Sequence, residues 1–227
     1  FAMAVNYAPP KPKIYYPDSD GAPMAESDFQ RQSLTYAVEA LGIFFAGRPD
    51  VYVSGNMFLY YEKGNPQAVV APDVFVVLGI PKAKRRSYLL WKEGKAPDFV
   101  LEITSESTQA SDQGPKRGLY ALLGVREYFL FDPTSDYLEP PLQGLRLEGN
   151  SYEPLPGQLL PDGGLSLHSE TLGLELRLDA KSNDLRFFDP ASGQILLSHA
   201  EATARAERAE AEVERLRAEL ARLRGEP

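Results

Sequence analysis

The sequence predicts a mixed α/β (α+β) protein with a central domain, an antiparallel β extension and a long C-terminal helix. Three observations predict it. In residues 24–133, helical periodicity alternates with short apolar runs that have the length of strands. Residues 134–198 hold short alternating segments that Gly and Pro turns separate. In residues 199–227, apolar or small residues repeat at heptad spacing.

Composition limits the class of protein. The chain has 227 residues, of which 43% are hydrophobic, which is enough for one well-buried core. No apolar run approaches the ~20 residues of a membrane helix, and the first residues lack the apolar run of a signal peptide, so we expect neither membrane nor targeting signal. The chain has no cysteine, which excludes disulfides and cysteine nucleophiles and fits a cytoplasmic location. The net charge of −8 argues against nucleic-acid binding by bulk charge.

The N-terminal part predicts an arm, a helix and a strand. Residues 1–23 are rich in Pro and Tyr and are expected to form an extended arm on the domain. Ser27 or Asp28 can cap a helix that runs to about Phe45, with its apolar residues on one face. Alternation then predicts a strand over residues 51–61.

The middle of the chain predicts three short apolar strands, at residues 73–78, 98–104 and 127–131. A loop or short helix with a basic cluster is expected between the first two, in residues 79–97. Between the last two, Asp112 can cap a helix that ends at Leu123, before Gly124. Pro115 falls in its first turn, where a missing N–H is tolerated.

The tail predicts a helix with one apolar seam. Its apolar or small residues are spaced 4-3-4-3-4-3: Ala202, Ala206, Ala209, Val213, Leu216, Leu220 and Leu223. Such spacing over about three heptads indicates a coiled coil, so we favour a homodimer or higher homo-oligomer. A solvated single helix packed on its own domain is the alternative.

Two acids lie in or beside predicted strands. In strand 98–104, Glu102 shares one face with Val100 and has apolar neighbours, so its carboxylate is expected to be at least partly buried. A buried carboxylate needs a cation, a lysine or a backbone cap to stay charged. Asp73, after Pro72, opens the preceding apolar strand. Two carboxylates from neighbouring strands predict a divalent cation; the alternative is that Glu102 caps a backbone N–H or pairs with an arginine.

Other polar residues could complete this site. Asp112, Lys116 and Tyr120 lie on one stripe of the predicted helix, which could face the carboxylates, although a solvated lysine is the alternative. Asp98 lies at the mouth of the Glu102 strand and could cap it or support the site. Glu39, in the first helix, could face the same cleft or lie on the surface. Thr104 shares the face of Glu102.

A basic cluster precedes the Glu102 strand. It contains Lys82, Lys84, Arg85 and Arg86. These side chains could contact phosphates despite the negative net charge, or they could belong to a solvated loop.

Four blocks in order carry a resemblance to a known family. They are Ala71–Val77, Pro97–Thr108, Asp112–Tyr120 and Leu123–Pro133, within similarity that extends from Tyr16 to Leu176. Together they resemble a bacterial family of restriction-endonuclease-like proteins in the PD-(D/E)XK nuclease superfamily. The resemblance implies a restriction-endonuclease-like core, with a central mixed β-sheet flanked by helices, and metal-dependent hydrolysis of DNA.

The resemblance also assigns roles at the site. Asp73 is then the first acid and Glu102 the second, and the carbonyl of Ile103 is a further metal ligand. Thr104 stands where the superfamily has its lysine, and Lys116 is the replacement from the following helix. All of these ligands are oxygen, which favours Mg²⁺ or Mn²⁺.

The sequence and the resemblance together predict two alternative functions. The first is a Mg²⁺- or Mn²⁺-dependent DNA endonuclease that works as a homo-oligomer. The second is a catalytically inactive nuclease-fold module that binds nucleic acid or protein and assembles through its C-terminal coiled coil.

Overall fold

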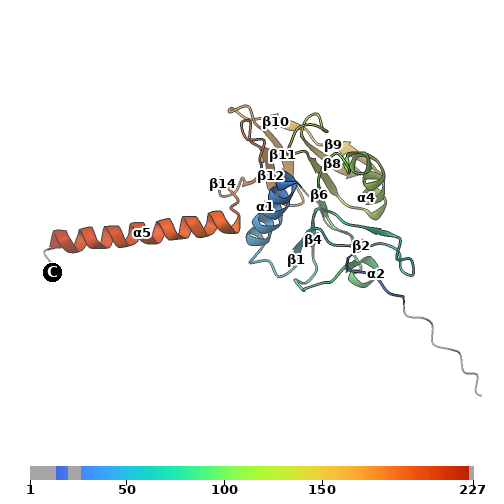
Figure 1. Cartoon of the computed structure of the whole chain (residues 1–227), viewed down its shortest axis with the longest axis horizontal. Helices are drawn as coiled ribbons and strands as arrows, with labels where there is room; N and C mark the ends of the chain where they lie inside the picture. Colours follow the sequence, from blue (N-terminus) through green and yellow to red (C-terminus); the bar gives the residue numbers. More distant parts are fainter. Residues whose placement is uncertain (1–13, 20–26, 225–227) are drawn as a thin grey trace, which may run out of the picture.

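The computed structural model describes residues 14–19 and 27–224. Its central sheet has six strands in the order β1-β4-β6-β7-β8-β9 (Figure 1). Strands β6 and β7 are parallel, and the other neighbours are antiparallel, so the sheet is mixed. The bounds are Val51–Ser54 for β1, Val74–Leu78 for β4, Phe99–Ile103 for β6, Glu127–Phe131 for β7, Leu142–Glu148 for β8 and Ser151–Pro154 for β9.

Two smaller sheets accompany the central sheet. One is antiparallel, with β10 (Gly157–Leu159), β11 (Leu165–Ser169), β12 (Leu174–Leu178), β13 (Leu185–Asp189) and β14 (Gln194–Ile195). The other joins β3 (Val69–Val70), β2 (Leu59–Tyr60) and β5 (Tyr88–Leu89). The helices are α1 (Asp28–Phe44), α2 (Leu90–Glu93), α3 (Gln109–Ser111), α4 (Arg117–Leu123) and α5 (His199–Arg224), with a π-helical segment, η1 (Asp112–Lys116), between α3 and α4. These sheets and helices confirm the mixed α+β class.

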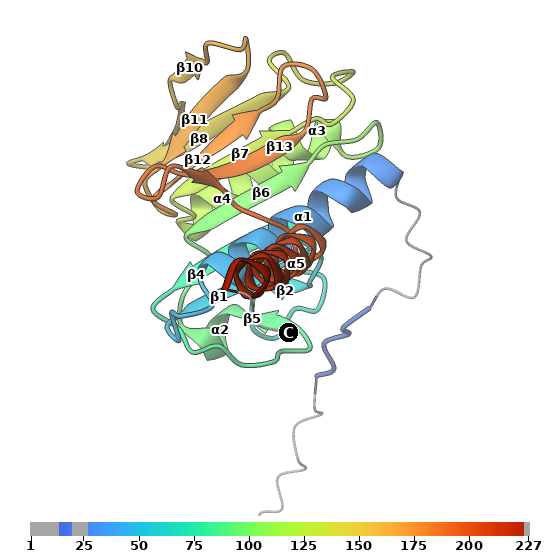
Figure 2. The ribbon, with the colours of Figure 1, turned by 90° about the vertical axis from the view of Figure 1, so that its left-hand side faces the viewer.

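The central sheet has an apolar core on each face. Helix α1 and the antiparallel sheet pack on one face, which receives Phe99 and Leu101 of β6. Helix α4 packs on the other face, where Val100 lies with Tyr120 and Tyr128. Figure 2 shows α1 between the antiparallel sheet and the small three-stranded sheet. Side chains alternate along a strand, so Glu102 shares the face of Val100 and points toward α4. The sequence predicted this shared face.

The start of the domain confirms the predicted helix and divides the predicted strand. Ser27 caps α1 through a capping box with Gln30. The expected strand 51–61 is two strands: β1 ends at Ser54, and β2 belongs to a different sheet. Within the expected arm, residues 1–13 and 20–23 lie outside the described residues. The described part contacts the domain, where the Tyr60 hydroxyl donates to the carbonyl of Pro17 at 2.6 Å.

Residues 134–198 contribute to two sheets. Strand β8 pairs with β7 and carries β9, so both extend the central sheet. Leu142 and Leu145 of β8 are buried in the two different cores, which places β8 inside the layered structure. Only β10–β14 form a separate antiparallel sheet. The central sheet therefore continues past residue 134, where we predicted that the β-rich extension begins. The division into domains at this residue stays a prediction.

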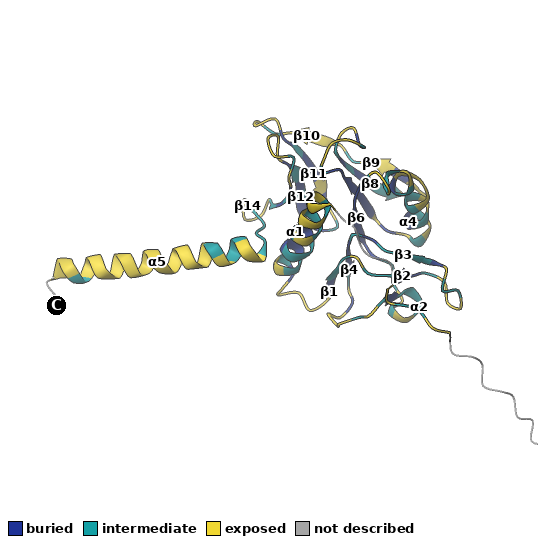
Figure 3. Cartoon of the chain, in the orientation of Figure 1, coloured by how far each residue is buried: buried dark blue, intermediate teal, exposed yellow. Residues whose placement is uncertain are grey.

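Helix α5 projects from the rest of the protein (Figure 1). Its first turn is held by the Arg186–Glu201 ion pair at 2.8 Å and by a 3.0 Å hydrogen bond from the His199 N–H to Glu39. No residue of α5 is buried, and most of its length is exposed (Figure 3). Among the residues that the structure describes, no helix is long and apolar enough to cross a membrane.

Asp132 organises the loop that follows β7. Its buried carboxylate accepts hydrogen bonds from four backbone N–H groups at 2.6–3.0 Å: those of Thr134, Ser135, Tyr137 and Leu138. Asp132→Ala should lower the free energy of unfolding by about 3 kcal/mol, because it leaves partly buried donors without an acceptor. Urea denaturation measures the change. Asp136→Ala, at an exposed aspartate of the same loop, is the matched control, and equal unfolding midpoints for the two variants would contradict the prediction.

Candidate active site

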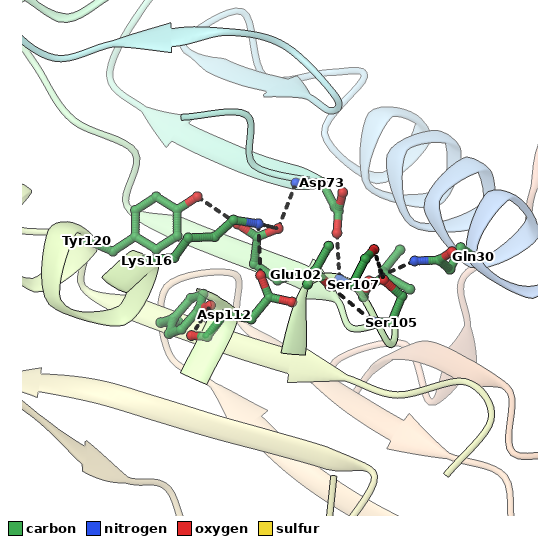
Figure 4. Close-up of polar contacts among 11 residues, drawn as sticks. Gln30, Asp73, Glu102, Ser105, Ser107, Asp112, Lys116 and Tyr120 are labelled. Carbon is green, nitrogen blue, oxygen red and sulfur yellow. Dashed lines mark hydrogen bonds and ion pairs between the residues drawn. The ribbon is translucent and has the colours of Figure 1, made fainter. Parts of the chain in front are cut away.

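The two acids of the predicted pair lie side by side. Strands β4 and β6 are antiparallel, with Val74 opposite Leu101, so Asp73 at the head of β4 meets Glu102. The Asp73 N–H donates to Glu102 Oε2 at 3.3 Å, and Asp73 Oδ2 accepts from the Ile103 N–H at 2.7 Å (Figure 4). Each carboxylate therefore receives a backbone N–H from the other strand. The structure places Asp73, Glu102 and Ile103 together, as the site hypothesis requires.

A glycine allows the chain to pass close to Asp73. After β1, the backbone turns at Gly55, and a Cβ atom there would lie 2.4 Å from the Asp73 carbonyl oxygen and 2.7 Å from Val38 Cγ2. The next residue, Asn56, has a positive φ of 50° and donates its N–H to the carbonyls of Pro72 and Asp73. This close approach ends β1 and holds the backbone that carries Asp73.

Lys116 lies between two buried carboxylates. Its Nζ is 3.0 Å from Glu102 Oε2 and 2.8 Å from Asp112 Oδ1. The side chain of Lys116 is 18% exposed, whereas those of Glu102 and Asp112 are fully buried. From the next turn, the Tyr120 hydroxyl donates to Glu102 Oε1 at 2.6 Å (Figure 4). The stripe predicted on this helix thus faces the carboxylates.

The helix that carries this stripe is irregular at the site. Asp112 was expected to begin it, but helical structure begins at Gln109 and widens to a π-helical turn over residues 112–116. Pro115 has no N–H, so the regular hydrogen bond to the carbonyl of Ser111 cannot form. The wide turn begins at Asp112 and ends at Lys116, and such turns are frequent at functional sites.

Burial dominates the electrostatics of the cluster. Desolvation, together with the negative charge of Asp73, raises the pKa of Glu102 to about 8, although Lys116 opposes the shift. Desolvation also raises the pKa of Asp73. Burial alone would lower the pKa of Lys116, but Glu102 and Asp112 outweigh it and raise that pKa. Lys116 is therefore cationic, and a proton on Glu102 reduces the repulsion between the acids.

The donor set fits a divalent cation. With Glu102 ionised, three carboxylates (Asp73, Glu102 and Asp112) oppose one lysine, which leaves two formal negative charges beside hard oxygen donors. Apart from the Lys116 ammonium at 2.8 Å from Oδ1, the carboxylate of Asp112 has no hydrogen-bond partner among the described residues. In residues 14–19 and 27–224, no three acidic, His or Cys side chains converge closely enough to hold a metal. A cation would thus use Asp73, Glu102 and the Ile103 carbonyl, which accepts a 3.4 Å hydrogen bond from Gln30.

The remaining predicted residues lie in three places. Asp98 lies just before β6, where its carboxylate accepts from the Leu78 N–H at the end of β4 and pairs with Lys95, both at 2.8 Å. Thr104 is buried at the other end, beside a cavity of about 240 Å³, and its hydroxyl has no hydrogen-bond partner among the described residues. Glu39 contacts the first turn of α5 and does not contact the two acids.

Most of the basic cluster is engaged within the protein. Lys82 donates to the carbonyls of Phe45 and Ala46 at the end of α1. Arg85 pairs with Glu93 at 2.8 Å and lies over the ring of Tyr52, and Arg86 pairs with Asp18 at 2.7 Å. Lys84 is exposed. Phosphate contact by these four residues stays a prediction. Lys84 and Arg86 are the best candidates, because both side chains are exposed to solvent.

The sequence offered two roles for Asp112: a helix cap, and a place on the stripe with Lys116 and Tyr120. Helical structure begins before Asp112, so it is not the cap, and its carboxylate is buried against Lys116. Its four-residue spacing from Lys116 and eight-residue spacing from Tyr120 was the available signal. The sequence contains no comparable signal for the role of Gly55, because that role depends on a contact with Asp73, at the start of another strand.

The fold and the acid–acid–lysine cluster together define the class of a nuclease-like α+β domain. The chain belongs to the Uma2 family, described as putative restriction endonuclease, whose model matches residues 3–181. This match confirms the resemblance to a restriction-endonuclease-like family. Among solved structures, the chain is similar to a putative nuclease belonging to DUF820 from Anabaena variabilis ATCC 29413. That similarity has 17% identity and a TM-score of 0.42, over 61% of this chain and 74% of that chain. No curated protein matched the sequence.

The raised pKa of Glu102 makes stability depend on pH. Between its ordinary pKa near 4.5 and its folded value of about 8, the folded protein binds more protons than the unfolded chain. The free energy of unfolding should therefore fall as pH rises from 5 to 8.5, with the raised pKa of Asp73 acting in the same direction. Thermal melts in chelator measure this slope. Glu102→Gln is the control and should flatten the slope; an equal slope in both proteins would contradict the prediction.

Proposed function

We propose that this protein is a metal-dependent endonuclease that hydrolyses phosphodiester bonds in DNA. Membership of the Uma2 family supports the nuclease class. The observation that carries the finer proposal is the cluster in which Lys116 contacts Glu102 at 3.0 Å while Glu102 contacts the backbone of Asp73. Two carboxylates, a carbonyl and a lysine at one point are suited to cleaving a phosphodiester, since they offer both cation ligands and a positive charge.

Asp73, Glu102 and the Ile103 carbonyl would hold Mg²⁺ or Mn²⁺. When bound, the cation would polarise a phosphate oxygen and lower the pKa of water. The chain itself prepares these ligands. Tyr120 fixes one oxygen of Glu102 at 2.6 Å, and the Ile103 N–H fixes one oxygen of Asp73 at 2.7 Å. Held this way, the carboxylates have little orientational freedom to lose on binding a cation.

Lys116 would act on the phosphate. It is cationic and is the partly exposed member of the Glu102–Lys116–Asp112 group, so its ammonium can approach a phosphodiester from solvent. There it would stabilise the negative charge that grows on the phosphate oxygens during attack by water. Asp112 keeps Lys116 in place through the 2.8 Å contact across the π-helical turn.

Calorimetric titration of Mg²⁺ and Mn²⁺, with plasmid nicking assayed on the same samples, tests the proposal. The wild type should bind the cation and nick plasmid, and chelator should abolish nicking. Asp73→Asn should lose cation binding and slow nicking by at least about a hundredfold, because it removes one ligand charge. Asp136→Asn, at an exposed aspartate outside the cluster, should behave as wild type.

The other outcomes have distinct meanings. Equal nicking by wild type and Asp73→Asn would contradict the proposed site. Cation binding without nicking would favour the inactive, nucleic-acid- or protein-binding module over the enzyme.

A further inference from the structure

Helix α5 presents an apolar stripe that the rest of the chain does not cover. The helix has 26 residues, which corresponds to about 39 Å. Val213, Leu216, Leu220 and Leu223 are 46–72% exposed, although they are the most apolar residues of the helix. Figure 3 shows that the helix is exposed almost everywhere beyond its first turns. An exposed apolar stripe of this kind marks a surface that a partner can cover.

The stripe has the register of a two-stranded coiled coil. Heptad position a holds Ala206, Val213 and Leu220, and position d holds Ala202, Ala209, Leu216 and Leu223. A β-branched residue at a with leucine at d favours two parallel helices. The alanines lie nearest the domain, so most of the apolar contact would come from the last two heptads.

The charges beside the stripe identify the partner. In a parallel, in-register pair, position g of one helix faces position e of the next heptad on the other. Here the facing residues are Arg205 with Glu210, Glu212 with Arg217, and Glu219 with Arg224. All three pairs have opposite charges, and symmetry repeats each of them. This complementarity is between α5 and an identical helix, so it selects a second copy of the chain.

Antiparallel pairing does not share this complementarity. It places g against g and e against e. In the antiparallel register that sets Leu223 against Ala206, Glu212 faces Glu219 of the second copy, which is repulsive, while Glu210 faces Arg217, which is attractive. The two contacts largely cancel, whereas all three parallel pairs are attractive. Within a single helix, Glu212 pairs with Arg215 at 2.6 Å and Glu214 with Arg217 at 2.8 Å. Those pairs are exposed and therefore weak, so they can exchange for pairs between helices.

We infer that α5 pairs with α5 of a second copy of this chain as a parallel, in-register two-stranded coiled coil. The pairing places both globular domains at the same end, because the first turn of each α5 is tied to its own domain by Arg186–Glu201. This inference is independent of the nuclease proposal, because its test measures the molar mass of the protein in solution and not the cleavage of DNA.

Sedimentation equilibrium of the full chain between 1 and 100 μM tests the pairing. The wild type should show a monomer–dimer equilibrium. Leu216→Glu with Leu220→Glu should weaken dimerisation by at least about a hundredfold, since it puts charge in the seam. Ala211→Glu with Ala218→Glu, two exposed positions on the outer face, is the matched control and should dimerise as wild type. A wild type that stays monomeric at 100 μM, or equal dimerisation by both double variants, would overturn the inference.

Cross-linking tests the orientation. The chain has no cysteine, so a single introduced thiol is unique. Leu223→Cys, at position d near the end of the helix, should form disulfide-linked dimers under mild oxidation, whereas Arg222→Cys, which faces outward, should form few. If Leu223→Cys chains instead link to Ala206→Cys chains and not to each other, the helices are antiparallel and the inferred arrangement is wrong.

Discussion

Glu102→Gln is expected to slow plasmid nicking by about a thousandfold while leaving the free energy of unfolding unchanged or higher. The change is isosteric: the amide oxygen can accept from the Asp73 N–H and Lys116, and the amide NH2 can donate to the Tyr120 hydroxyl, which can also accept. It removes the ligand charge on which the proposed cation depends, which accounts for the expected loss of rate. The fully buried carboxylate is costly to ionise, as its pKa of about 8 indicates, so a neutral group should be tolerated.

Nicking rates and urea denaturation on the same preparation at pH 9 separate the two effects. At that pH Glu102 is ionised in the wild type, so the difference in stability should be largest. Glu106→Gln, at an exposed glutamate beyond the same strand, is the matched control and should change neither quantity. A nicking rate within threefold of wild type would show that Glu102 takes no part in the reaction. A large loss of stability would show that its role is structural.

At pH 9, where Glu102 is ionised, Lys116→Met is expected to lower the free energy of unfolding by about 3–5 kcal/mol in the absence of a divalent cation. Methionine retains much of the side-chain volume but removes the positive charge that Glu102 and Asp112 share at 3.0 and 2.8 Å. The two buried carboxylates then lose their counter-charge, and the protein must take up protons or unfold. Lys84→Met, at an exposed lysine, is the control and should change stability by less than about 0.5 kcal/mol.

A double-mutant cycle tests the cause of that destabilisation. If the loss arises from uncompensated charge, Lys116→Met combined with Glu102→Gln should be more stable than Lys116→Met alone. Saturating Mg²⁺ should also recover part of the stability of the single variant, because a cation can replace the missing charge. Strictly additive effects of the two substitutions would show that Lys116 and Glu102 are not coupled.

Local patterns in the sequence determined which residues share a face. Alternation placed Glu102 on the face opposite Phe99, Leu101 and Ile103, and the four-residue spacing placed Lys116 and Tyr120 on one stripe of their helix. The Ser27 cap and the strands β6 and β7 also follow from local signals. Each of these features depends on the 2.0 or 3.6 residue period or on groups within one turn, which the sequence contains directly.

Only the tertiary structure decided how those faces meet. Gly55 against the Asp73 carbonyl divides the expected strand 51–61, and helical structure that begins at Gln109 removes Asp112 from the expected cap position. Glu39 lies against α5, and β8 and β9 continue the central sheet past residue 134. These outcomes depend on contacts between residues far apart in the chain, so the packing of complete layers selects them, and no local period specifies them.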